Sequence, residues 1–81
     1  MSIKKSRAWF VCRQWPKLVS QHYANDVAVG RALGVDIRVL AKLRVRSPVA
    51  KSTILHALRS YAAWHDPGLR IVELVVDTRA R

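Results

Sequence analysis

The sequence predicts a mostly α fold with a small β element, arranged as one compact domain. The chain has 81 residues, about half of them apolar, which suits a single small domain with a packed core. Apolar residues recur at helical spacing through two long stretches between about residues 26 and 65. A later stretch, residues 69–77, is rich in β-branched side chains and predicts a strand.

The first third of the chain predicts a basic arm, a short helix and a loop. Residues 1–7 carry three cations and are expected to form a frayed arm. Residues 8–15 predict a short helix that ends before Pro16, because the residue before a proline is displaced from helical angles. Residues 17–26 are expected to form a loop or a single helical turn.

A helix is predicted from about Asp26 to residue 46, with a core stripe on one side and cations on the other. Asp36 is the only acidic residue between positions 27 and 46, whereas a merely solvated face usually mixes both signs. This imbalance indicates an anionic partner. The core stripe comprises Leu33, Ile37, Leu40 and Leu43, and the basic strip comprises Arg31, Arg38, Lys42 and Arg46.

The next helix is predicted to begin at Ser47 as N-cap, with Pro48 at the first helical position, and to end near His65. Lys51 lies near the positive end of the helix dipole, where a cation does not stabilise the helix. An anionic ligand is one reason for a lysine at this position. One arc of this helix predicts core residues, namely Ala50, Ile54, Ala57, Leu58, Tyr61 and Trp64. The opposite arc is polar, with Ser52, His56, Arg59 and Ser60.

The rest of the chain predicts a turn at residues 66–68, the strand at residues 69–77 and a basic tail at residues 78–81. Residues 8–77 would then form the single domain. Trp9, Trp15 and Trp64 are expected in the core, given how few large side chains a domain of this size has.

The net charge of +10 points to an anionic partner, because internal ion pairs cannot neutralise it. Nucleic acid is the first candidate, and an anionic membrane surface or an acidic protein is the second. The single cysteine, Cys12, excludes an internal disulfide and favours a reducing compartment. The sequence has no apolar run long enough for a membrane span or a signal peptide, so a cytoplasmic location is expected.

Catalysis, a cofactor and a metal site are not expected. The five acidic residues are scattered, and the three glycines stand alone rather than in a phosphate-binding loop. Cys12 could be paired with a histidine as nucleophile and base, but no third, orienting group is indicated. The same side chains lack the close spacing of metal ligands, and Cys12 is expected to be a small buried apolar residue.

Four stretches of the chain resemble the ProQ/FinO family of bacterial RNA chaperones. They are residues 34–40 (GVDIRVL), 50–61 (AKSTILHALRSY), 15–19 (WPKLV) and 67–72 (PGLRIV), and the resemblance covers about residues 8–77. It implies a mostly helical domain that binds the base of an RNA stem-loop and its single-stranded 3′ end, without a cofactor. Such a protein would act as an RNA chaperone or post-transcriptional regulator.

The resemblance also implies site residues for RNA. Lys51 matches the lysine at the family's helix start, Arg59 and Tyr61 match its Ala-Leu-Arg-x-Tyr motif, and Arg70 matches the arginine before the strand. Together with Arg31, Arg38 and Lys42 of the basic strip, they form the predicted RNA-binding set. A second arginine that the family carries one turn before Arg59 is Leu55 here.

Two other functions remain open from the sequence. A winged helix-turn-helix DNA-binding protein also has two consecutive helices, the second with a polar basic face, followed by a strand. The helix after Ser47 offers only His56 and Arg59 in its middle for reading bases. The other alternative is an interaction protein that binds an acidic partner or a membrane surface without nucleic acid.

Overall fold

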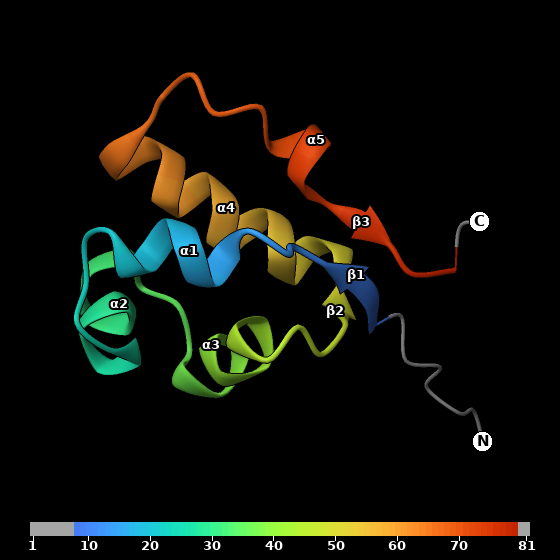
Figure 1. Cartoon of the computed structure of the whole chain (residues 1–81), viewed down its shortest axis with the longest axis horizontal. Helices are drawn as coiled ribbons and strands as arrows, with labels where there is room; N and C mark the ends of the chain where they lie inside the picture. Colours follow the sequence, from blue (N-terminus) through green and yellow to red (C-terminus); the bar gives the residue numbers. More distant parts are fainter. Residues whose placement is uncertain (1–7, 80–81) are drawn as a thin grey trace.

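Helices make up most of the fold, and three short strands bring distant parts of the chain together (Figure 1). The computed structural model describes residues 8–79; the predicted arm at 1–7 and the last two residues of the predicted tail lie outside this range. In chain order the elements are β1 (Ala8–Val11), α1 (Trp15–Ser20), α2 (Asp26–Leu33), α3 (Ile37–Arg44), β2 (Val49–Ala50), α4 (Lys51–His65), α5 (Ile71–Leu74) and β3 (Val76–Asp77). The predicted fold class, mostly α with a small β element in one domain, is confirmed.

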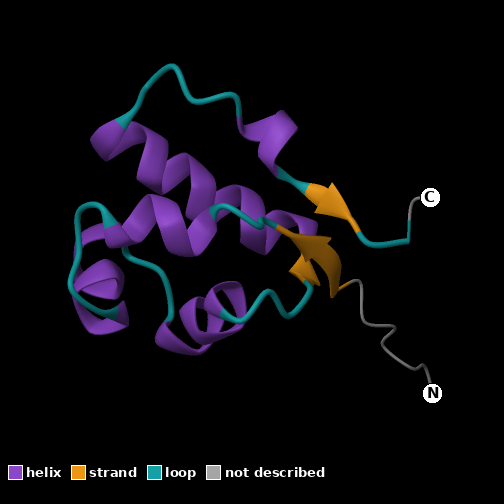
Figure 2. Ribbon diagram, in the orientation of Figure 1, coloured by secondary structure: helices purple, strands orange, loops and turns teal. Residues whose placement is uncertain are grey.

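The three strands form an antiparallel sheet in the order β2-β1-β3, at one end of the molecule (Figure 2). Phe10 is opposite Val49 on one side and Asp77 on the other. The backbone N–H and the hydroxyl of Thr78 each donate to the carbonyl oxygen of Trp9 at 2.8 Å. The sheet therefore ties the beginning and the end of the described chain to its middle.

The helix predicted for residues 8–15 is wrong, because residues 8–11 form the central strand. Aromatic and β-branched side chains suit a pleated, half-buried surface, and both partner strands come from far along the chain. Helix α1 instead begins at Trp15, with Pro16 in its first turn, where the missing N–H costs no hydrogen bond. Helix α1 therefore occupies residues 17–20 of the predicted loop.

The single helix predicted from Asp26 to residue 46 is two helices, α2 and α3. Gly34 ends α2 in the left-handed conformation, with φ of 70°, and Asp36 caps the start of α3. This break rotates α3 relative to the predicted stripe. Leu33, Leu40 and Leu43 are buried as predicted, but Ile37 is 49% exposed.

Helix α4 begins at Lys51, three residues later than the predicted first helical position, and ends at His65 as predicted. Val49 and Ala50 pair with β1, so sheet hydrogen bonds displace the expected Ser47 cap. The predicted core positions Ile54, Ala57, Leu58 and Tyr61 are buried.

Two further predictions near the C-terminus are wrong. Trp64 is 70% exposed, because this end of α4 is buried on the side of Tyr61 and Ala62, and Trp64 lies outside that side. Residues 69–77 form the four-residue helix α5 and the two-residue strand β3 instead of one strand. Ile71, Leu74 and Val75 pack against the core from this segment, which an extended strand with strict alternation would not allow.

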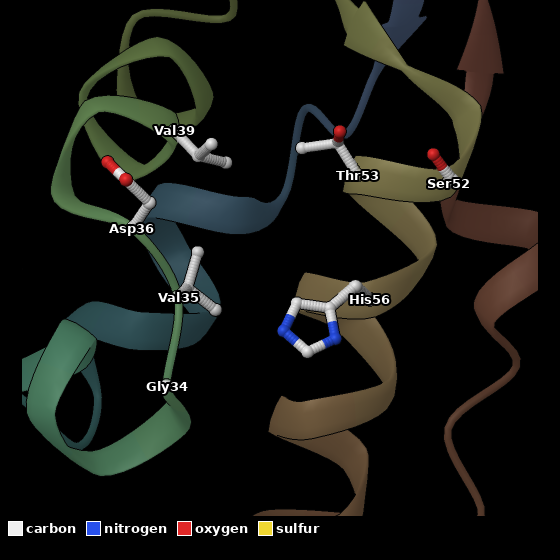
Figure 3. Close-up of a pocket in the computed structure, with 7 residues that line it drawn as sticks. All are labelled: Gly34, Val35, Asp36, Val39, Ser52, Thr53 and His56. Carbon is white, nitrogen blue, oxygen red and sulfur yellow. The ribbon is translucent and has the colours of Figure 1, made fainter.

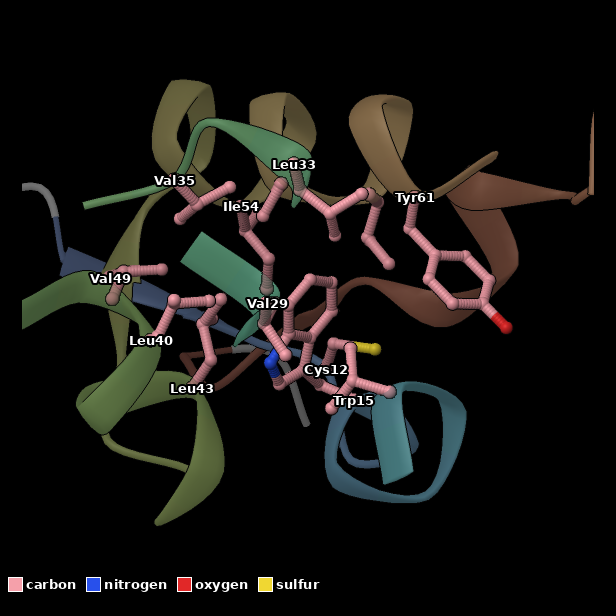
Figure 4. Close-up of a cluster of buried hydrophobic side chains, with 13 residues drawn as sticks. Cys12, Trp15, Val29, Leu33, Val35, Leu40, Leu43, Val49, Ile54 and Tyr61 are labelled. Atoms are coloured by element: carbon pink, nitrogen blue, oxygen red, sulfur yellow. The ribbon is translucent and has the colours of Figure 1, made fainter. Parts of the chain in front are cut away.

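The core lies between α4 and the three helices α1, α2 and α3 (Figure 4). Trp15 is completely buried and meets Tyr61 edge to face, with ring centroids 6.4 Å apart. The Tyr61 hydroxyl donates to the carbonyl oxygen of Leu18 at 3.4 Å. Cys12 is buried as predicted, and burial raises the pKa of its thiol. Among residues 8–79, no helix combines the length and the apolar character that a bilayer span needs.

Candidate nucleic-acid interface

A glycine on α2, Gly30, faces the turn that follows this helix and the side chain of Leu40 on α3. A Cβ atom on Gly30 would lie 3.1 Å from the carbonyl oxygen of Val35 and 3.4 Å from Cδ1 of Leu40. Few side chains tolerate contacts this tight. Gly30 therefore leaves room for the Val35 carbonyl of the turn and for Leu40, which is completely buried.

A three-residue turn, Gly34–Asp36, joins these two helices. The backbone N–H of Gly34 donates to the carbonyl oxygen of Gly30 at 2.9 Å, and its φ of 70° reverses the chain. Val35 in the middle of the turn is buried. Two packed helices joined by a short turn that contains glycine have the connectivity of a helix-turn-helix.

Side-chain caps and one ion pair hold the two helices in place. The Asn25 side chain accepts a hydrogen bond from the backbone N–H of Ala28 at 2.9 Å, and Asp36 accepts one from the backbone N–H of Arg38 at 2.7 Å. The carboxylate of Asp26 pairs with the guanidinium of Arg44, so the first turn of α2 is linked to the last turn of α3.

The outer face of α3 is exposed and carries two cations beside two apolar side chains. The Arg38 side chain is 89% exposed, and Ile37, Ala41 and Lys42 are exposed beside it on the same helix. The predicted strip residue Arg31 is exposed on α2. Three of the predicted site residues thus belong to the helix-turn-helix.

The start of α3 carries one carboxylate, Asp36. The backbone N–H of Arg38 donates to it and lowers the pKa of this carboxyl below its ordinary value, and the Arg38 guanidinium adds to the effect. Asp36 is therefore ionised near neutral pH, which suits its position at the positive end of the α3 dipole.

A hollow of about 410 Å³ separates the start of α3 from the first turns of α4 (Figure 3). Val35, Asp36 and Val39 line one side, and the His56 ring is directed toward them from the other. Ser52 and Thr53 complete the α4 side. Ser52 and His56 of the polar face predicted for α4 therefore lie beside the helix-turn-helix.

The predicted residues Lys51 and Arg59 lie elsewhere, in a groove between α4 and the segment that contains α5 and β3. Arg70 precedes α5, and its guanidinium pairs with Glu73 at 2.9 Å. Tyr61 is only 3% exposed, so its ring is unavailable for stacking on a base. The seven predicted residues therefore do not form one site.

The sequence reasoning missed four residues of the helix-turn-helix, namely Gly30, Gly34, Ile37 and Ala41. A signal for the turn exists, because two glycines, Gly30 and Gly34, lie one helical turn apart within the helical pattern. The interpretation of residues 26–46 as a single helix obscures it. The winged arrangement considered from sequence used α4 as its second helix and a strand over 69–77, of which only Val76–Asp77 is a strand.

Comparison with known proteins gives no match to a family model, to a curated protein or to a solved structure.

Proposed function

We propose that this protein binds duplex DNA through the helix-turn-helix formed by α2 and α3. The burial of Leu40 and Leu43 on one side of α3, with Ile37, Arg38, Ala41 and Lys42 exposed on the other, is the observation that carries the proposal. Gly30 leaves room for Leu40 where α3 packs against α2. An α-helix fits the major groove of B-DNA, where base edges can be read.

The exposed side chains of α3 suit contacts with base edges. Arginine donates two hydrogen bonds to O6 and N7 of guanine, and lysine can bond the same atoms or a phosphate. Ile37 and Ala41 offer apolar surface of the kind that contacts the methyl group of thymine. Mixed polar and apolar exposure on a short helix favours base reading over a generic charged surface.

The remaining cations suit the DNA backbone. Arg31 is exposed on α2, and the first helix of a helix-turn-helix crosses the phosphate backbone. The net charge of +10 adds sequence-independent affinity through release of counterions. A cytoplasmic location, with access to DNA in a bacterial cell, agrees with this function and with the single, buried Cys12.

RNA binding is the second candidate, as the resemblance to RNA chaperones implies. Lys51 and Arg59 favour it, because both line the same groove and neither is in an ion pair within residues 8–79. The burial of Tyr61 weakens it. The pairing of Arg70 with Glu73 does not distinguish the candidates, because Arg38 on α3 also pairs with a carboxylate, that of Asp36. We therefore rank it below DNA binding.

Two charge-matched double variants separate the candidates. Arg38→Gln/Lys42→Gln removes two cations from α3, and Lys51→Gln/Arg59→Gln removes two from α4. Each variant and the native protein would be titrated by fluorescence anisotropy against a duplex DNA of about two helical turns and an RNA hairpin with a 3′ tail.

The proposal predicts that the α3 variant binds duplex DNA at least about tenfold more weakly, since one good base contact is worth about 1–3 kcal/mol. The slope of its affinity against salt concentration should fall by about one for each phosphate that the variant leaves unneutralised. The α4 variant should keep most of its affinity for DNA. Preference of the native protein for the hairpin, abolished in the α4 variant alone, would refute DNA binding and support RNA binding.

A further inference from the structure

The groove between α4 and the α5–β3 segment combines an apolar floor with cations. It has a volume of about 360 Å³. Phe10, Leu55, Val72 and Val75 supply its apolar surface, and Val72 is 84% exposed. Figure 1 shows α5 and β3 on one side of α4 and the helix-turn-helix on the other. The groove is therefore separate from the proposed DNA contact.

The charges along this groove are predominantly positive. Lys51 and Arg59 are eight residues apart on α4, or about 12 Å along its axis, with Leu55 midway between them. Asp77 also lines the groove, but it is paired with Arg79 at 2.8 Å. Lys51 also interacts electrostatically with the Asp77 carboxylate, but neither Lys51 nor Arg59 forms an ion pair within residues 8–79. The groove therefore keeps two cations, one on either side of Leu55.

These features select among possible occupants. A second copy of the chain would bring another +10 of charge to a positive groove, which opposes association. An RNA strand would satisfy Lys51 and Arg59 but would leave the aliphatic side chains of Leu55 and Val72 without apolar partners. A peptide with both apolar and acidic side chains satisfies both halves of the groove.

We propose that this groove docks an amphipathic helix of an acidic partner protein. The helix would present two carboxylates about two turns apart to Lys51 and Arg59. Apolar side chains between them would cover Leu55 and Val72. This is the helix-in-groove mode of recognition, with charge complementarity fixing the register of the helix.

The test uses a displayed library of random helical peptides, selected for binding to the native protein. A positively charged protein attracts acidic peptides in general, so the control must have the same net charge. Lys51→Glu/Arg59→Glu places the charge change in the groove, and Arg38→Glu/Lys42→Glu places an equal change on α3. Val72→Ser removes exposed apolar surface without disturbing the core.

The expected peptides carry acidic residues seven or eight positions apart with apolar residues between them. They should bind at least tenfold more weakly to the groove variant, several-fold more weakly to Val72→Ser, and within twofold of native to the α3 variant. Thermal melts would confirm that each variant is folded.

Three results would overturn the proposal. Equal losses of affinity in both charge variants would mean generic attraction of acidic peptides. Unchanged binding by Val72→Ser would mean that the apolar surface takes no part. A native dimer in sedimentation experiments that Val72→Ser dissociates would make the occupant a second copy. The outcome with duplex DNA bears on none of these, so the two proposals can fail separately.

Discussion

Gly34 controls the turn on which the proposed DNA contact depends. It has a φ of 70°, a conformation that costs other L-residues free energy because Cβ approaches the following carbonyl. Space is not the constraint, since a Cβ atom there would meet nothing within 4 Å. Gly68 lies in the turn after α4 and has no positive φ.

We predict that Gly34→Ala lowers the free energy of unfolding by about 1–2 kcal/mol. Gly68→Ala is the matched control and should change it by less than about 0.5 kcal/mol, because a Cβ there would lie 3.8 Å from the Asp66 carboxylate. Urea denaturation would measure both variants. Equal effects at the two positions would mean that the turn does not need a left-handed residue.

An aromatic cluster joins the loop after α1 to the end of α4. The rings of His22 and His65 stack with centroids 3.9 Å apart, and the hydroxyl of Tyr23 lies 2.6 Å from Nε2 of His65. Tyr61 also contacts both histidine rings. Desolvation, and then the neighbouring charge of His22, lower the pKa of His65 below its ordinary value of 6.5.

Acidification should therefore destabilise the protein. Below about pH 6.5 the unfolded chain binds more protons at His65 than the folded chain does, so stability falls as the pH falls toward the folded-state pKa. Thermal melts between about pH 7.5 and pH 5.5 would show this decline, and His65→Gln should reduce its slope. A His65→Gln variant with the native pH dependence would contradict the assignment.

At the scale of elements, the sequence predicts the interior of helices better than their ends. Ile54, Leu58 and Tyr61 are predicted in the core of α4 and are buried, because periodicity alone determines which face is apolar. The ends of helices and strands depend on segments that are distant in the sequence. Val49 and Ala50 leave the predicted helix to pair with β1, and residues 8–11 form a strand because two remote segments flank them.

The candidate site is only partly predictable for a related reason. The one-sided charge identifies the cations Arg31, Arg38 and Lys42, but their role depends on a break in the helix at Gly34. A glycine within a helical pattern is compatible with a helix that continues through it and with a helix that ends there in a turn. Tertiary packing of Leu40 on Gly30 decides between the two, and a single sequence does not display that contact.

The ion pair between Asp26 and Arg44 should couple α2 to α3. We predict a coupling free energy of up to about 1 kcal/mol from a double-mutant cycle of Asp26→Asn and Arg44→Gln, measured by urea denaturation. Asp26→Asn alone should lower the free energy of unfolding by more than Arg44→Gln alone does, because Asp26 is also favourable at the positive end of the α2 dipole. Additive losses of stability would show that the pair contributes nothing to the orientation of the two helices.

The whole molecule separates two cationic regions. One lies on α3 beside the turn after α2, and the other lies in the groove between α4 and α5, so an overall charge of +10 does not imply one binding surface. The proposed functions use these regions differently. The first would contact duplex DNA, and the second would contact an acidic helix.

A residue-resolved NMR titration of the labelled protein with duplex DNA would locate the nucleic-acid interface. We expect the amide signals of the Gly34–Asp36 turn and of α3 to shift most and that of Arg31 to shift less, while the signals of Leu55 and Val72 stay near their free positions. An RNA hairpin of equal charge should give smaller shifts at the same concentration. If the largest shifts instead map to Lys51, Leu55 and Arg59, with RNA or with DNA, the helix-turn-helix is not the nucleic-acid interface.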